Sequence, residues 1–355
     1  MPVTRQALKA HALASSLFGP TTLRRAVERL GFVQADPIRS PARAQDLILR
    51  HRVKDYYAGD LERQYPKLGF EEDFLYAYGF VPPSTWRLLH PRLDAGLSAA
   101  EKRVLAFVSA QKRLHPRELE AHLGREREIN AWGGYSKATT RVLQTLHYRG
   151  LLRVAGRENG IRLYTATTQQ HEPMEPEERL RRLVLLIAQI LAPVPERSLR
   201  ETLRHLGHAA PDLSGRSTIV SRLIRSGELM SAEVEGLRYL WPAGKLIRKQ
   251  PENTVRFLAP FDPLVWDRRR FEHLWGWAYR FEAYTPVAKR KLGYYAMPLL
   301  WRQEVIGWAN VSCKLGKLTI KTGFISTEPK ESEFRRALAA EIERFRSFLS
   351  PTSCY

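Results

Sequence analysis

The sequence predicts an α+β protein in which one unit, three short helices followed by a β-hairpin, occurs more than once. Residues 98–164 and 177–240 share the same order of amphipathic helices, glycine stops and strand-forming runs, with Gly150 and Gly227 at matching positions. Hydrophobic residues make up 44% of the chain and charged residues 26%, which is the composition of a folded protein. Because 355 residues exceed the size of one ordinary hydrophobic core, we expect several domains.

Breaks in composition divide the chain into four segments. Residues 169–176 are polar, contain two prolines and lack hydrophobic periodicity, which is typical of a linker. Paired prolines at 82 and 83 interrupt helix near the first joint, and a stretch bounded by Pro242 and Pro251 marks the last. The predicted domains are therefore residues 1–95, 96–172, 173–248 and 249–355.

The first segment is predicted to hold an altered copy of the unit. Helical spacing over residues 6–17 and 21–30 ends at Gly31, and the run FVQADPI at 32–38 then alternates until a proline stops it. Gln34 and Asp36 are two positions apart, so in an extended chain both side chains project to the same side. From the residues alone Asp36 has two interpretations: it forms a turn or cap around Pro37, or it belongs to a polar functional pair.

The second and third segments carry the two regular copies of the unit. Three helices and a hairpin form a winged helix, a helix-turn-helix variant whose third helix usually enters a DNA groove. The predicted third helices begin with SKATTR at 136–141 and SGRST at 214–218. Small hydroxyl groups and cations at a helix N-terminus suit phosphate contact, although the same residues also serve as simple caps in a protein-binding winged helix.

The charge of the chain predicts a polyanionic partner. Lys and Arg number 57 against 37 Asp and Glu, and the excess of +20 is spread over all four segments rather than placed in a tail. Nucleic acid is favoured over a membrane, because the chain has neither a polybasic amphipathic helix nor an apolar run of about 18 residues. A chain with only two cysteines has neither a disulfide framework nor a cysteine-based zinc site, and its sequence contains no metal or cofactor motif. The N-terminus has no apolar signal core, which predicts a cytoplasmic protein.

Two sets of motifs resemble those of a known family. The first is GFVQADPI at 31–38, with Arg43 and LRHR at 49–52 after it; the second is APFDPLVWDRRR at 259–270, with YYAMPLL at 294–300. They resemble the bacterial winged-helix DNA glycosylases of the AlkZ/YcaQ type, and the similarity extends over nearly the whole chain. The resemblance implies three tandem winged-helix units followed by a C-terminal β-rich domain.

The resemblance also implies an activity and a site. Members of the family hydrolyse the N-glycosidic bond of N-alkylated purines and unhook interstrand crosslinks, so the implied partner is double-stranded DNA carrying alkylated or crosslinked purines. Their catalytic motif maps onto Gln34, Ala35 and Asp36. We expect Asp36 to act as electrostatic partner and general base and Gln34 to position water or the sugar. The motif contains no lysine, which predicts a monofunctional enzyme without a Schiff-base lyase step. We also expect no cofactor, a monomer, and association with the nucleoid.

The candidate DNA contacts are the basic and hydroxyl side chains of these segments: Arg43, Arg50, Arg52, Lys54, Lys137, Thr139, Arg141, Arg216, Ser217, Arg222, Arg268 and Arg269. The arginine run at 268–270 has a second interpretation, an internal ion-pair cluster with Asp262, Asp267 and Glu272. Two other functions stay open. A non-catalytic winged-helix regulator leaves the Gln34 and Asp36 pair unexplained, and a nuclease lacks evident clusters of acidic metal ligands.

Overall fold

The computed structural model describes residues 2–92, 96–123, 127–129, 135–168, 174–247, 250–314 and 317–349. Each predicted domain boundary, after residues 95, 172 and 248, falls on residues outside these ranges, so the boundaries stay predictions. Helices and strands are mixed throughout the described part of the chain, which confirms the α+β class.

The first segment builds a small antiparallel sheet surrounded by helices. The sheet has the strand order β1-β3-β2, so β1, which carries Gln34, is an edge strand. The threonines before the first two helices cap them, and Gly31 ends the second in the left-handed conformation, with φ 69°. The elements are α1 (Arg5–Ser16), α2 (Leu23–Leu30), β1 (Val33–Gln34), α3 (Ala44–Leu49), α4 (Asp60–Leu68), β2 (Glu71–Phe74), β3 (Tyr78–Val81) and α5 (Pro83–Leu89).

The two middle segments both show the predicted order of three helices and a hairpin. The first copy comprises α6 (Ala99–Ser109), α7 (Pro116–Leu123), β4 (Arg127–Ile129), β5 (Tyr135–Lys137), α8 (Ala138–Tyr148), β6 (Leu152–Glu158) and β7 (Ile161–Ala166). The second copy comprises α9 (Pro176–Ile190), β8 (Val194–Pro195), α10 (Glu196–Ala209), α11 (Ile219–Arg225), β9 (Leu229–Val234) and β10 (Leu237–Pro242). The third helix of the second copy begins at Ile219 rather than at residue 214, so Arg216 and Ser217 lie in the turn before it.

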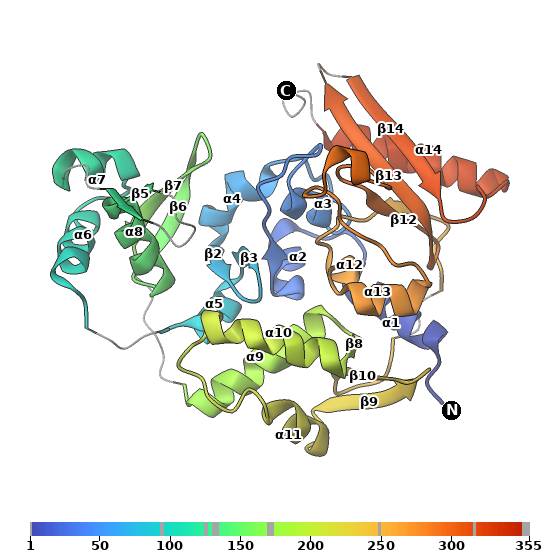
Figure 1. The fold of residues 1–355 in the computed structure, drawn as a ribbon, viewed down its shortest axis with the longest axis horizontal. Helices are drawn as coiled ribbons and strands as arrows, with labels where there is room; N and C mark the ends of the chain where they lie inside the picture. The colour runs from blue at the N-terminus through green and yellow to red at the C-terminus, as the bar shows by residue number, and fades with distance from the viewer. Residues whose placement is uncertain are drawn as a thin grey trace.

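The last segment is a four-stranded antiparallel sheet, ordered β11-β12-β13-β14, with helices on it. Figure 1 shows this sheet and α14 at one end of the molecule and the first copy of the unit, α6 to β7, at the other. The elements are β11 (Val255–Phe257), α12 (Pro263–Trp266), α13 (Arg268–Trp275), the 3-10 helix η1 (Val287–Lys289), β12 (Met297–Trp301), β13 (Glu304–Lys314), β14 (Lys317–Phe324) and α14 (Ser332–Phe348).

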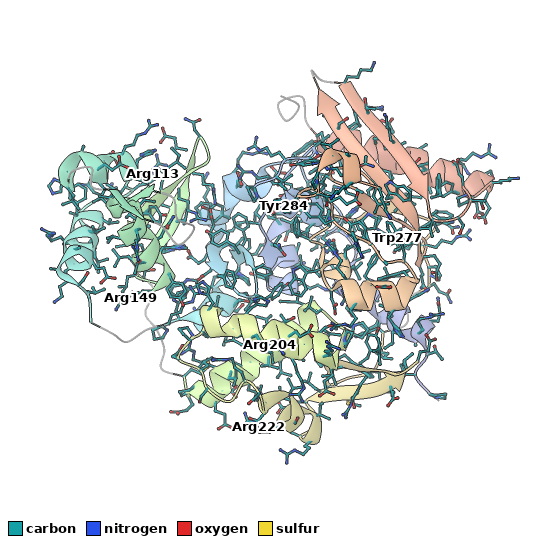
Figure 2. The ribbon with its side chains drawn as sticks, viewed as in Figure 1. Arg113, Arg149, Arg204, Arg222, Trp277 and Tyr284 are labelled. Atoms are coloured by element: carbon teal, nitrogen blue, oxygen red, sulfur yellow. The ribbon has the colours of Figure 1, made fainter. Side chains whose placement is uncertain are left out.

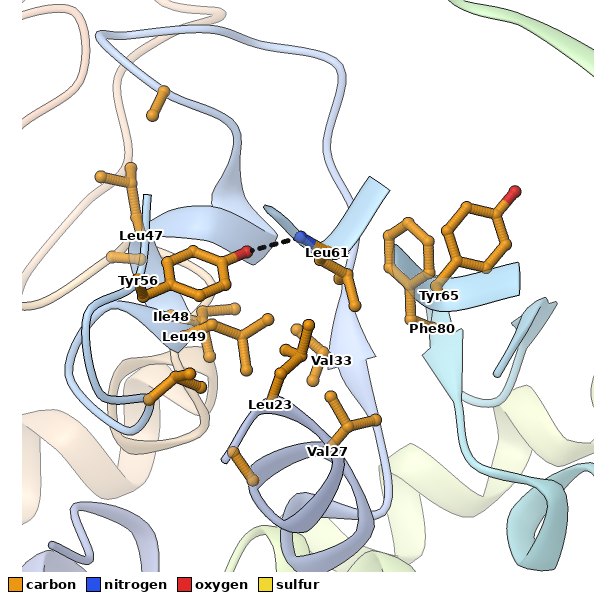
Figure 3. Close-up of a cluster of buried hydrophobic side chains, with 14 of the residues drawn as sticks. Leu23, Val27, Val33, Leu47, Ile48, Leu49, Tyr56, Leu61, Tyr65 and Phe80 are labelled. Atoms are coloured by element: carbon orange, nitrogen blue, oxygen red, sulfur yellow. Dashed lines mark hydrogen bonds between the residues drawn. The ribbon is translucent and has the colours of Figure 1, made fainter. Parts of the chain in front are cut away.

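The hydrophobic cores are shared between segments. One buried cluster combines side chains of α2, α3 and β1 with side chains of β6, β11, β12 and α14; its part around β1 is drawn in Figure 3. A second cluster joins α5 to α9 and α10, and α1 packs against α12 and α13. Because segments far apart in the sequence pack on the same side chains, β1 is held from several directions.

Close packing around β1 requires a glycine opposite Gln34. Gly79 pairs with Gln34 across the sheet, and a Cβ atom at that position would lie 2.3 Å from the carbonyl oxygen of Val33 and 2.6 Å from the ring of Phe32. No side chain fits in that space, so the glycine sets how close β3 comes to β1.

Candidate active site

Gln34 and Asp36 project from the sheet edge formed by β1. The backbone N–H of Ala35 donates to the carbonyl of Tyr78 at 2.9 Å, which extends the strand pairing one residue beyond β1. Ala35 packs on the core, so the side chains of Gln34 and Asp36 project to the opposite face of the extended chain. The local conformation predicted from the two-residue spacing is therefore present.

The Asp36 carboxylate is oriented by a tight turn. Its Oδ1 accepts a hydrogen bond from the backbone N–H of Ile38 at 2.9 Å, which confirms the turn around Pro37. The side chain is half-buried; burial raises the pKa of Asp36, and the Ile38 hydrogen bond offsets only part of that rise. The turn leaves Oδ2 available, so the structural and functional interpretations of Asp36 are compatible.

Gln34 carries a buried acceptor with no protein partner. Its Oε1 is inaccessible to solvent and makes no hydrogen bond to the described residues. Leaving such a group unsatisfied costs about 1–3 kcal/mol, and Oε1 is therefore a candidate to accept a hydrogen bond from a water or a ligand.

The C-terminal segment brings a third polar group to this region. Tyr295, two residues before β12, is 2% exposed, and its hydroxyl also lacks a hydrogen-bond partner among the described residues. Its ring stands edge-on to Phe281 with centroids 5.3 Å apart. Burial raises the pKa of Tyr295 well above its usual value, and the negative charge of Asp36 adds to that rise.

The sequence does not single out Tyr295. Its only signal is a place in the YYAMPLL run, where an aromatic residue before a buried strand has the ordinary appearance of a core residue.

A buried ion pair joins the two motif-bearing segments. Arg52 and Asp262 are both fully buried and form a bidentate pair, with N–O distances of 2.8 and 3.0 Å. The remaining donors of Arg52 go to the carbonyls of Ser16 and Ile48 and to the hydroxyl of Ser16, so all five are used. This pair ties the chain after α3 to the turn before α12.

Two predicted phosphate contacts are corrected by this packing. Arg52 has neither an exposed atom nor a spare donor, and Arg50 is buried against Glu341 with its guanidinium 4.2 Å from the centre of the Phe345 ring. Both arginines therefore stabilise the contact between the first and last segments, and the prediction that they contact DNA is wrong for this structure. A basic LRHR run has the same appearance in sequence whether it faces solvent or a neighbouring domain.

The arginine run at 268–270 is internal for the most part. Arg268 donates to the carbonyl of Pro260 at 2.9 Å and lies over the Tyr279 ring, and Arg270 is buried and donates to the carbonyls of Leu191 and Pro263. Only Arg269 is substantially exposed, and it pairs with Glu201 of α10 at 3.1 Å. Arg268 is thus half-buried with internal partners, and its predicted DNA contact stays a prediction. The predicted ion-pair cluster is replaced, because backbone carbonyls are the main partners.

The other candidate contacts fall into two groups. In the first group the side chains are buried or already have protein partners. Thr139 is buried, which contradicts its predicted contact with DNA. Arg43 pairs with Glu62, Arg222 pairs with Glu177, and Arg216 donates to carbonyls of its own turn. Lys54, Arg141 and Ser217 are exposed, and the side chain of Lys137, in β5, lies outside the described residues. Both copies of the unit carry exposed basic side chains, such as Arg113 on the first copy and Arg204 on the second, which Figure 2 labels.

The hairpin of the first copy is occupied by contacts to β2. Arg153 pairs with the buried Glu71 at 2.5 Å, and Arg157 binds both carboxylate oxygens of Glu72. Burial tends to raise the pKa of Glu72, but Arg157 and Arg162 outweigh it and hold that pKa at about 2. The hairpin is therefore fixed to the sheet that carries Gln34.

The described residues contain no group of three or more His, Cys, Asp and Glu side chains placed to hold a metal ion. Within the same part of the chain, every helix is too short or too polar to cross a membrane.

The chain is strongly basic, which favours a polyanionic partner, and it carries an amide and a half-buried carboxylate on one strand edge. The family model described as DNA glycosylase AlkZ-like matches residues 27–348, and the chain belongs to this AlkZ-like family of DNA glycosylases. The match covers nearly the whole chain, including the segments of Asp36 and Tyr295, and confirms the resemblance seen in the sequence. No solved structure matches the chain.

Proposed function

We propose that this protein excises N7-alkylated purines from duplex DNA and unhooks interstrand crosslinks, by hydrolysis of the N-glycosidic bond without a lyase step. The observation that carries the proposal is the placement of Asp36. Its half-buried carboxylate is oriented by a turn beside the orphaned amide oxygen of Gln34, in a chain of the AlkZ-like family. The protein acts as a cytoplasmic, nucleoid-associated monomer and needs no cofactor.

Hydrolysis of this glycosidic bond needs no strong general acid. Alkylation at N7 makes the purine cationic, so the C1′–N9 bond breaks with its electron pair moving to the base, which leaves neutral. Positive charge develops on the deoxyribose, where the Asp36 carboxylate stabilises it. Water then bonds to C1′ and gives its proton to Asp36, which acts as the general base.

Gln34 contributes position rather than proton transfer. An amide does not take up a proton usefully at neutral pH, but its Oε1 can accept a hydrogen bond from a water molecule. Holding that group beside Asp36 lowers the entropic part of the barrier.

The three-helix and hairpin units are proposed as winged helices that bind the duplex. Because the arginines of the first hairpin pair with Glu71 and Glu72, this copy presents its helices to DNA rather than its hairpin. Exposed cations such as Lys54 and Arg141 supply non-specific affinity through counterion release.

The direct test measures base release from a duplex containing 7-methylguanine and strand separation of a crosslinked duplex. Wild type, Gln34→Ala and Asp36→Asn are compared under single-turnover conditions, with and without EDTA. We expect Asp36→Asn to lose about 10²-fold or more of the rate, and EDTA to have no effect. Undiminished activity of Asp36→Asn overturns the assignment, and sequence-specific binding without base release indicates a regulator instead.

A further inference from the structure

The two most exposed large hydrophobic side chains of the described residues lie in one loop. Tyr284, which Figure 2 labels, is 79% exposed and Val287 is 76% exposed. Both belong to residues 280–294, between α13 and β12, which we call the Tyr284 loop. The proline and the alanine that flank Val287 are exposed as well. A single exposed apolar side chain is ordinary, but several in one loop indicate an interaction surface.

The Tyr284 loop is held in one conformation by hydrogen bonds of its own. The carboxylate of Glu282 is buried, and its Oε2 accepts hydrogen bonds from the backbone N–H groups of residues 291–293 at 2.7–3.2 Å. The side chain of Arg290 crosses the loop and donates to the carbonyl of Thr285 at 2.8 Å. Because these bonds join the beginning of the loop to its end, the loop loses little conformational entropy when it binds a partner.

The base of the Tyr284 loop is packed on the core. The ring of Tyr284 stands edge-on to Phe281, with centroids 6.1 Å apart. Phe281 in turn stands edge-on to Phe261 at 5.1 Å and to Tyr295 at 5.3 Å. Phe261 and Phe281 pack on the hydrophobic cluster that also contains Val33 of β1. Tyr284 therefore projects into solvent from a fixed aromatic base.

The flanks of the Tyr284 loop are basic. Residues 280–294 contain four cationic side chains and a single acidic one, Glu282, which is buried. Arg280, Lys289 and Lys291 are exposed, and none of the ion pairs between described residues includes them. An ordered apolar tip between unpaired cations is complementary to duplex DNA, in which phosphates flank a stack of bases with apolar faces.

We propose that the Tyr284 loop is a wedge that enters the base stack of bound duplex DNA. Tyr284 and Val287 lie against the faces of the bases, and Lys289 and Lys291 bind the flanking phosphates. The assignment rests on the proposed action on duplex DNA. Apolar side chains that enter a base step partly unstack it, so the wedge has a direct spectroscopic signature.

The test measures base unstacking, DNA affinity and stability for matched variants. The duplexes carry 2-aminopurine, whose fluorescence rises when it loses its stacked neighbours, at successive positions around one N7-methylguanine on a non-cleavable 2′-fluoro sugar. Tyr284→Ala removes the ring of the wedge, and Tyr284→Phe keeps it. Ile325→Ala is the control, because Ile325 is 41% exposed but begins a run, residues 325–333, with three acidic side chains and one lysine.

We expect wild type to raise the fluorescence at a position near the lesion. Tyr284→Ala loses most of that rise and binds the duplex about tenfold more weakly, whereas Tyr284→Phe behaves as wild type. Because the Tyr284 side chain is mostly in solvent, Tyr284→Ala keeps the wild-type melting temperature. Lys289→Gln lowers the salt dependence of log affinity by about one unit, and Ile325→Ala changes none of these quantities.

Wild-type fluorescence and affinity in Tyr284→Ala overturn the inference, as does an equal loss in Ile325→Ala. If Tyr284→Ala binds DNA as wild type does but binds phosphatidylglycerol–phosphatidylcholine vesicles more weakly, the loop belongs to a membrane surface and the inference is overturned. If wild type unstacks the duplex through Tyr284 but releases no 7-methylguanine from a cleavable duplex, the proposed function fails and the wedge is supported. If wild type releases the base and Tyr284→Ala unstacks the duplex equally well, only the wedge fails.

Discussion

The buried pair of Arg52 and Asp262 gives a quantitative prediction about how the site is assembled. Substituting Asp262→Asn removes the carboxylate and leaves a fully buried guanidinium without its counter-charge. One charge-assisted hydrogen bond is lost and the other becomes a bond to a neutral amide oxygen, and breaking a buried ion pair costs about 3–5 kcal/mol in total. We expect the free energy of unfolding to fall by about 4 kcal/mol.

The assay is urea-induced unfolding followed at the tryptophans, with Glu343→Gln as the matched control. Glu343 pairs with Arg346 on the surface of α14, with side chains 63% and 59% exposed, so its loss costs less than about 1 kcal/mol. The double substitution Arg52→Met with Asp262→Leu removes both charges and recovers much of the lost stability. If Asp262→Asn stays within about 1 kcal/mol of wild type, the argument that this pair holds the first and last segments together is refuted.

Three further predictions follow from the same geometry. Burial, followed by the charge of Arg50, holds the pKa of His51 well below its usual value. Because the unfolded chain therefore takes up a proton at His51 at a higher pH than the folded chain does, wild type loses stability relative to His51→Gln as the pH falls below about 6.5. Melting temperatures of the two proteins that change in parallel with pH would exclude this. Gly79→Ala forces a Cβ to within 2.3 Å of a β1 carbonyl and lowers both stability and base release, whereas Gly19→Ala, with open space around it, changes neither. Lys54→Ala and Arg141→Ala each reduce the salt dependence of log affinity for duplex DNA by about one unit, and unchanged slopes in both would place the DNA on another face.

The pH dependence of base release is tied to Asp36. The carboxylate must be ionised to stabilise the sugar and accept a proton, and burial raises its pKa. We therefore expect the rate to fall, on acidification, at a pH above the ordinary value of about 3.9 for aspartate. Asp36→Asn lacks this limb, and a limb that persists in Asp36→Asn would assign the titration to another group.

Local features of the fold were predictable from the sequence. The glycine stop at Gly31, the extended run through Asp36 and the repeated order of three helices and a hairpin depend on near neighbours, and all are present. The sequence predicts that the third helix of the second copy begins at residue 214, whereas α11 begins at Ile219, because Ser214 and Gly215 resemble a cap but belong to a turn in which Arg216 donates to the Leu213 carbonyl.

Long-range features of the site were not predictable. Arg50 and Arg52 lie in a basic run that resembles a phosphate-binding segment. Only the packing of the last segment shows that they form ion pairs with Glu341 and Asp262. Both pairs depend on contacts between residues more than two hundred positions apart, about which local periodicity and charge carry no information.

The most direct test of the whole account is single-turnover release of 7-methylguanine by Asp36→Asn. The substitution keeps the size of the side chain and an acceptor for the Ile38 N–H, so the turn and the fold are preserved. The account predicts wild-type DNA affinity and melting temperature with a rate at least about 10²-fold lower. A rate equal to that of wild type would contradict it.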